Sequence, residues 1–298
     1  MTIHVASLSA SEPAAAQQSA TAILDAGFEG IVLDAPLQYT AWRGLRELLP
    51  KDTVKAINLF LPYPRTLRPG ERPSFSAAAE NRLERADSFA QARKTLEAVD
   101  ELGIPLVLVP MTQLELAGLE RGYLEPTSLL EQDQLGLRND SEELRARYDS
   151  LLMLLSFLLE QAERYATTIC LTPGNRPGEL PLVPEIVSCL KEFGGAPLGL
   201  WLDTRRLPAE LLGVPHIGAA ASAPELDLSS RIQGAYIADE TAEGAACQPG
   251  QGVVPWDQVS YSIDGLPLWC VSGEPAEGRR FLAGLEETDS PPVGLFEA

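Results

Sequence analysis

Short, almost continuously apolar runs alternate with longer amphipathic stretches along the whole chain. A continuous apolar run of about four to eight residues is typical of a strand in a parallel sheet, whose two faces are both covered. Such runs predict eight strands, at 3–9, 30–35, 54–61, 104–110, 167–173, 198–204, 234–239 and 267–272. Apolar positions at helical spacing predict helices at 13–26, 40–49, 80–102, 140–162, 182–193 and 275–287.

This alternation of strands and helices favours one closed architecture. Eight βα units in 298 residues fit a (β/α)8 TIM barrel of the α/β class, which chains of this size form as a single domain. We therefore expect one domain over residues 1–298. An open doubly wound sheet is the alternative, but it usually carries a Gly-rich phosphate loop after the first strand, and SLSASEP is not such a loop.

Local signals place several helix ends. Gly27 and Gly103 are expected to end the first and third helices, since glycine accepts the left-handed conformation that closes a helix. Asp140 with Glu143 fits a capping box at the start of the strongest helix, and Ser141 is the neighbouring candidate for the cap.

The composition excludes some partners. The net charge is −19, which argues against binding to nucleic acids or to anionic membranes, because both need a basic surface. No run approaches the ~20 apolar residues of a membrane span. We expect no signal peptide, because the first residues have neither a basic start nor a long apolar run. The four cysteines show no CxxC spacing, so we expect reduced thiols in a cytoplasmic protein.

The sixth predicted strand ends in LGLWLDTRRL, at the edge where barrel enzymes place their catalytic groups. Asp203 can act there in catalysis or binding, or it can accept hydrogen bonds from the following turn or pair with an arginine. Arg205 and Arg206 can be solvated or paired with acids. Alternatively, one of them supplies positive charge in the barrel mouth for a small anionic ligand.

Other strand ends carry further candidates. Asp34 follows the second strand, and Asp239 and Glu240 follow the seventh, where they can act as acid or base groups or cap the next helices. The turn 249–252 includes Gln251 and can either wrap a ligand or be an ordinary Gly-rich turn.

Several segments, in the correct order, resemble xylose isomerase-like TIM-barrel proteins, the sugar-phosphate isomerase/epimerase group that also includes endonuclease IV. They cover about residues 20–275, and each alone is a weak signal. GFEGIVL resembles the second strand of that group, and RKTLEAVDELGIPLVLVP resembles its helix and fourth strand. LEQAERYATTICLTPGNR, LGLWLDTRRL and QPGQGVVPWDQV resemble the segments around its fifth, sixth and seventh strands.

The resemblance implies a divalent metal held by a Glu, an Asp, a His and a Glu from strands five to eight. Here the fifth-strand position is Thr172, although Asn175 and Arg176 match the group, and the sixth-strand position is Asp203. The seventh-strand position is Tyr236 or Ile237, depending on whether Asp239 or Glu240 is aligned with the acid that follows. The eighth strand contains no acid, and Glu274 lies just beyond it.

A divalent ion needs several negative or strongly basic ligands, so one or two carboxylates should hold it poorly. We therefore expect no metal cofactor (Mn, Mg or Zn) and a degraded family site. The resemblance implies a sugar or sugar-phosphate isomerase or epimerase whose activity is altered or lost. The alternative is a non-catalytic barrel that binds a small polar or anionic metabolite or a partner protein, and a homodimer is possible. An endonuclease IV-like nuclease fits poorly, because the chain lacks both its ligand cluster and a basic surface.

Overall fold

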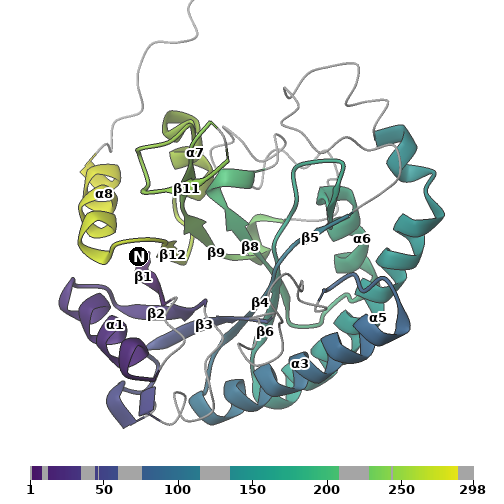
Figure 1. The fold of residues 1–298 in the computed structure, drawn as a ribbon, viewed down its shortest axis with the longest axis horizontal. Helices are drawn as coiled ribbons and strands as arrows, with labels where there is room; N and C mark the ends of the chain where they lie inside the picture. The colour runs from purple at the N-terminus through teal and green to yellow at the C-terminus, as the bar shows by residue number, and fades with distance from the viewer. Residues whose placement is uncertain are drawn as a thin grey trace, which may run out of the picture.

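The eight main strands close into a parallel barrel (Figure 1). The computed structural model describes residues 2–8, 13–34, 44–45, 47–59, 76–114, 135–207, 228–242 and 244–287. Around the barrel the strand order is β1-β12-β9-β8-β6-β4-β3-β2, and every neighbouring pair is parallel. The barrel strands are β1 Ile3–Leu8, β2 Gly30–Leu33, β3 Val54–Asn58, β4 Leu106–Val109, β6 Thr168–Leu171, β8 Leu198–Asp203, β9 Ile232–Ile237 and β12 Leu268–Val271.

Helices cover the outside of this barrel. Figure 1 shows the long helices α3 and α5 together along one side, where they contact each other, while α1 and α8 meet beside the first and last strands. The helices are α1 Pro13–Asp25, α3 Arg82–Leu102, α5 Glu142–Tyr165, α6 Val183–Glu192, α7 Trp256–Ile263 and α8 Pro275–Glu287. None of the helices in the described ranges is long and apolar enough to cross a membrane.

The structure confirms the predicted barrel and all eight strands. It also adds elements that the apolar pattern did not predict. These are helix α7 and two small antiparallel two-stranded sheets, β5 (Thr112–Gln113) with β7 (Glu179–Leu180) and β10 (Asp239–Glu240) with β11 (Ala246–Cys247). The predicted helix at 40–49 lies mostly outside the described residues, although positions 44–45 and 47–48 are helical.

The apolar residues divide into two cores because successive strand side chains point to opposite faces. One core fills the space between the barrel and its helices, and the other fills the barrel itself. Trp201 is the largest fully buried side chain of the inner core. It lies opposite Gly234, where an added Cβ would come within 2.6 Å of the indole ring, so glycine makes room for the tryptophan.

Side-chain caps set the starts of the two longest helices. Asn81 caps α3 by accepting hydrogen bonds from the backbone N–H groups of Leu83 and Glu84. Ser141, rather than Asp140, caps α5 by accepting from the N–H of Leu144. The capping box proposed for Asp140 was therefore wrong by one position, and the neighbouring candidate is correct.

Candidate functional site

A polar layer lies at the carboxyl ends of the barrel strands, directly above the apolar inner core. Because side chains alternate along a strand, the residue two positions beyond an inward-facing apolar residue also faces inward. Trp201 belongs to the inner core, and Asp203 therefore faces the barrel mouth. The same rule applied to Val5, Val32, Ala56 and Cys170 places these residues at the mouth: Ser7, Asp34, Asn58 and Thr172.

Asp203 is held by the arginine two positions later. Its Oδ1 accepts from the backbone N–H of Arg205 at 3.0 Å and from Nε at 2.9 Å, while Oδ2 accepts from Nη2 at 2.6 Å. This two-pronged contact, a strong form of ion pair, raises the pKa of Arg205 further above its ordinary value despite the opposing effect of burial. Two of the roles predicted for Asp203, accepting a hydrogen bond from the following turn and pairing with an arginine, are thus both present.

Arg206 turns to a different partner, the fully buried carboxylate of Glu179. Its Nη1 pairs with Oε1 of Glu179, whose Oε2 accepts from the backbone N–H groups of Asn175 at 2.9 Å and Arg176 at 3.2 Å. Glu179 therefore ties the loop after β6 to the end of β8. The amide oxygen of Asn175 is buried without a hydrogen-bond partner among the described residues.

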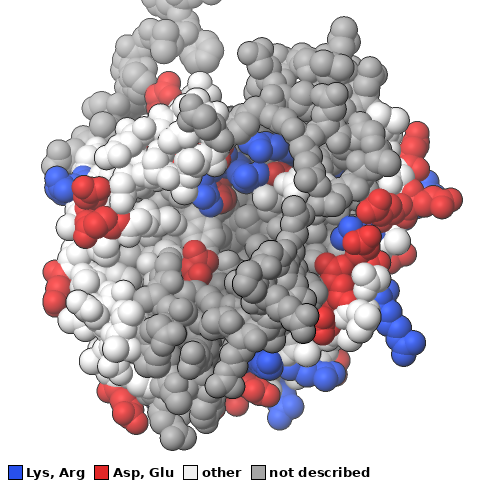
Figure 2. All heavy atoms as spheres, viewed as in Figure 1, with Lys and Arg blue, Asp and Glu red and all other residues white. Residues whose placement is uncertain are grey.

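Arg176 reaches across the mouth toward β10. Its Nη2 lies 3.8 Å from Oε1 of Glu240, which is almost completely buried. Figure 2 shows basic side chains beside acidic ones in a hollow near the loops that follow β8 and β9. The three predicted arginines of the mouth are each paired with a carboxylate: Arg176 with Glu240, Arg205 with Asp203 and Arg206 with Glu179.

Asp239 holds the loop that follows β11 through hydrogen bonds. Its two oxygens accept five hydrogen bonds, from the backbone N–H groups of Glu240, Gly250, Gly252 and Val254 and from the indole N–H of Trp256. Burial opposes its ionisation, but these donors outweigh that effect and lower the pKa of Asp239 below its ordinary value. An added Cβ at Gly252 would lie 2.2 Å from Oδ1 of Asp239, so the loop needs glycine there.

Asp34 lies on the opposite side of the mouth with fewer partners. Its Oδ2 accepts from the hydroxyl of Ser7 at 3.1 Å, and its Oδ1 accepts from Nδ2 of Asn58 at 3.0 Å. Burial raises the pKa of Asp34 above its ordinary value, because these two bonds and the more distant charge of Arg205 only partly offset the loss of water. A carboxyl group of this kind is suited to accept or release a proton.

Tyr236 comes from β9 at the level of Asp203, with which it pairs in the sheet register. Its ring lies edge-on to Trp201 at a centroid distance of 5.5 Å. Burial, followed by the negative charge of Asp34, raises the pKa of the phenol well above its ordinary value, so the hydroxyl keeps its proton. The nearby phenol favours the ionised form of Asp34, yet its oxygen completes no hydrogen bond with any described residue.

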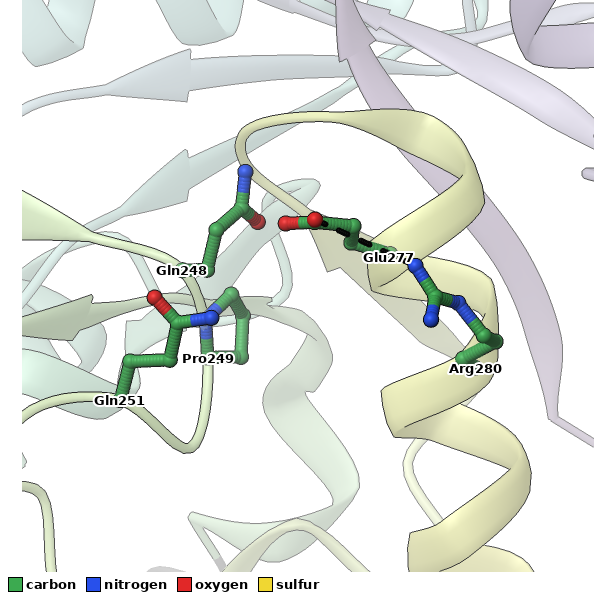
Figure 3. Close-up of a pocket in the computed structure, with 5 residues that line it drawn as sticks. All are labelled: Gln248, Pro249, Gln251, Glu277 and Arg280. Atoms are coloured by element: carbon green, nitrogen blue, oxygen red, sulfur yellow. Dashed lines mark ion pairs between the residues drawn. The ribbon is translucent and has the colours of Figure 1, made fainter.

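Of the remaining predicted positions, Thr172 belongs to the mouth, whereas Glu274 and Gln251 are exposed at the surface. Thr172 is buried after β6, and its N–H donates to Val109. Glu274 is exposed, and its carboxylate accepts from the N–H of Glu277 at the start of α8. Gln251 is exposed and lines a surface pocket of about 180 Å³ between the 248–251 loop and α8, together with Gln248, Pro249, Glu277 and Arg280 (Figure 3).

The residues at the mouth do not fit the divalent metal that the sequence resemblance implies. In the part of the chain that the structure describes, no three His, Cys, Asp or Glu side chains gather as a ligand group. Asp203 is occupied by a guanidinium, Thr172 supplies a hydroxyl, and Glu274 is engaged in a helix cap. This donor set has neither the charge nor the number of ligands that such an ion needs.

Sequence reasoning missed four of the side chains that shape the mouth. Ser7 and Asn58 are polar residues that follow apolar residues on the inward-facing sides of β1 and β3. The alternation rule could therefore have identified them. Glu179 lies in a Pro- and Gly-rich segment that carries no periodic signal, and Arg138 donates to its backbone carbonyl. Only the closed barrel brings Glu179 to Arg206, 27 positions away.

Comparisons with known proteins identify the fold. No family model and no curated protein matches the sequence. A D-tagatose 3-epimerase-like protein matches in structure with a TM-score of 0.65 at 16% identity, covering 96% of this chain and 97% of that one. An L-ribulose 3-epimerase matches with a TM-score of 0.62 at 16% identity, covering 97% and 95%.

A third solved structure points the same way. The 3-keto-D-glucoside 4-epimerase YcjR from E. coli matches with a TM-score of 0.58 at 17% identity, covering 96% of this chain and 100% of that one. Structural matches at identities this low show the fold, and they do not show which substrate the chain takes. The chain has the TIM-barrel fold that these three epimerase structures share.

Proposed function

We propose that this chain is a sugar isomerase- or epimerase-like barrel that binds a small carbohydrate at its mouth without a divalent metal. The observation that carries this proposal is the state of Asp203. Both of its carboxylate oxygens accept hydrogen bonds from the guanidinium of Arg205. The fold supports the carbohydrate, and the occupied aspartate supports the absence of the metal.

The physical argument rests on charge and on lone pairs. A divalent ion at this position would have to displace Arg205 from Asp203 and would then lie close to its positive charge. Two unit charges about 4 Å apart interact by about 4 kcal/mol near a protein surface, and a divalent ion doubles that repulsion. The fixed guanidinium therefore takes the place of the cation in neutralising Asp203.

Asp34 is the group that we assign to any retained proton transfer. Isomerisation or epimerisation next to a carbonyl removes a proton from carbon and returns it to the other carbon or to the other face. Asp34 carries a raised pKa, faces the mouth and is separate from the Asp203–Arg205 pair. A carboxylate with these properties can accept such a proton and release it again.

The second candidate is a barrel that binds the same ligand without turning it over. It is favoured by the pairing of Arg176, Arg205 and Arg206, because each is held by a carboxylate rather than open to the reacting oxygen of a substrate. Oxyanion stabilisation in enzymes depends on donors aimed at the place where charge develops.

One experiment separates these outcomes. Metal-stripped protein is incubated with D-tagatose, L-ribulose and their phosphates in D2O, with and without Mn²⁺, and followed by NMR and thermal shift. Metal-independent deuterium incorporation that Asp34→Asn abolishes supports an active barrel. A raised melting temperature without exchange identifies a binder. Turnover that requires Mn²⁺, or a melting temperature unchanged by every sugar, contradicts the proposal.

A further inference from the structure

Two buried polar atoms beside Asp34 have no hydrogen-bond partner among the described residues. They are the phenol oxygen of Tyr236 and the amide oxygen Oδ1 of Asn58. More than nine-tenths of such buried groups in folded proteins are satisfied, so two in one layer call for an explanation. Tyr236 is only 9% exposed.

The orientation of Asn58 follows from its neighbour. A carboxylate only accepts hydrogen bonds, so the amide nitrogen of Asn58 must face Oδ1 of Asp34, as observed at 3.0 Å. The amide oxygen therefore points elsewhere, and it remains an acceptor without a donor.

The orientation of Tyr236 is set by packing. The ring lies against Trp201 in the inner core, with a centroid distance of 5.5 Å and an interplanar angle of 74°. The hydroxyl lies within the electrostatic reach of Asp34 and Asp203, which belong to the mouth. The phenol stays protonated near neutral pH, because burial and these negative charges raise its pKa. It is therefore a hydrogen-bond donor held close to Asp34, the carboxylate that Asn58 also contacts.

We propose that Tyr236 and Asn58 together recognise a neutral hydroxyl group of the ligand, with the phenol donating to its oxygen and the Asn58 amide oxygen accepting its proton. This assignment rests on the proposed function, since it places the ligand in the same mouth. It specifies the group that is bound at the floor of that mouth, namely one hydroxyl on an uncharged part of a sugar.

A hydroxyl fits this pair better than a charged group does. It can donate and accept at once, whereas a phosphate or carboxylate oxygen offers no proton to Asn58. The nearby carboxylate of Asp34 also repels an anion, and an ammonium group would gain nothing from the phenol donor. The floor therefore selects for a hydroxyl, and any phosphate on the ligand would lie away from it.

Tyr236→Phe tests the assignment because it removes only the hydroxyl. A hydroxyl that stabilises the fold would lower the melting temperature when removed. A buried hydroxyl without a partner costs free energy in the empty protein. At pH 3, where Asp34 is protonated and its charge no longer gains from the phenol, removal of the hydroxyl should therefore leave the melting temperature unchanged or higher. Affinity for D-tagatose or L-ribulose, measured by calorimetry, should fall about tenfold.

Tyr148→Phe is the matched control. The hydroxyl of Tyr148 lies on α5, 3.5 Å from the backbone oxygen of Glu185 and 3.6 Å from Sγ of Cys189. Its removal should lower the melting temperature slightly and leave sugar affinity unchanged. The same chemical change thus gives opposite results at the two positions.

A series of monodeoxy ketohexoses identifies which sugar hydroxyl Tyr236 and Asn58 bind. One of them should bind the wild-type protein about tenfold more weakly than the parent sugar does, and this difference in affinity should be smaller for Tyr236→Phe. If the wild type binds sugars and every deoxy analogue loses as much affinity in Tyr236→Phe, the inference is wrong while the proposed function stands. A lower melting temperature for Tyr236→Phe at pH 3 overturns the inference without any ligand. If the wild type binds no sugar, both ideas fail.

Discussion

The charged groups on the two sides of the barrel mouth have different kinds of partner. Around Asp203, each of three carboxylates forms an ion pair with an arginine: Asp203 with Arg205, Glu179 with Arg206 and Glu240 with Arg176. Around Asp34, a buried carboxylate has two neutral donors, and two neighbouring polar atoms have none. The carboxylates of the Asp203 side are thus paired with arginines, although the amide oxygen of Asn175 has no partner there among the described residues. The Asp34 side keeps both a donor and an acceptor without a partner.

The largest expected effect lies next to the matched side, at the loop held by Asp239. Asp239→Asn replaces one acceptor oxygen by a donor that faces the N–H groups of the loop. The free energy of unfolding should fall by about 3–5 kcal/mol, measured by urea denaturation. Asp257→Asn, an exposed change on α7, is the control and should have little effect.

The same variant should change the pH dependence. The folded-state pKa of Asp239 lies below its ordinary value of 3.8, so its stabilisation is present above that value and is lost as the pH falls through the lowered pKa. The wild type should therefore lose stability as the pH falls below about 4, and Asp239→Asn should lose less over the same range. Parallel profiles would contradict the assignment.

Arg206→Gln tests the ion pair that ties β8 to the loop after β6. The change leaves Glu179 fully buried with two backbone N–H donors and no opposite charge. Stability should fall by about 2–4 kcal/mol, because an uncompensated buried charge is costly. Arg280→Gln removes a largely exposed arginine and should cost far less. Equal losses would remove the basis for calling this side tightly matched.

Asp34→Asn should change the stability in the opposite direction and make the protein more stable. Burial raises the pKa of Asp34, so the ionised form is disfavoured in the fold, and its cost appears as the pH rises from 3.8 through the raised pKa. Removing the charge should stabilise the protein at neutral pH by about 1 kcal/mol and leave stability unchanged at pH 3. A destabilised variant at neutral pH would erase the contrast between the two sides.

Ser7→Ala should give the smallest change. The Ser7 hydroxyl donates to Oδ2 of Asp34 and favours its ionised form. Its removal should raise the pKa of Asp34 further, as followed by carboxyl NMR titration, and should cost about 0.5 kcal/mol at neutral pH. An unchanged titration would show that Ser7 does not act on Asp34.

Sequence patterns were sufficient for the barrel because each strand is a compact apolar run that local composition reveals. Helix α7 was missed because its eight residues begin directly after a Gly- and Pro-rich turn, at Trp256, and are too few to show a clear period. The cap of α5 was misplaced by one residue because Asp140 and Ser141 are both good caps, and only backbone geometry separates them.

The site was harder to predict than the fold because its contacts join distant parts of the chain. The end-of-strand rule located Asp34, Asp203 and Asp239, but not which of them is already satisfied. Asp239 follows a strand just as Asp34 does, yet its neighbours are the N–H groups of a loop that folds back over it. Partners of this kind depend on barrel closure and loop path, which no local pattern encodes.

The packing of Trp201 against Tyr236 has a consequence for measurement. Tyrosine emission overlaps tryptophan absorption, so light absorbed by Tyr236 passes to an indole whose ring centroid is 5.5 Å away. Trp201 is wholly shielded from solvent and emits from inside the barrel, whereas Trp256 at the loop remains partly exposed. The floor of the mouth thus carries its own fluorophore, and the wavelength of its emission can report events at the phenol without an added label.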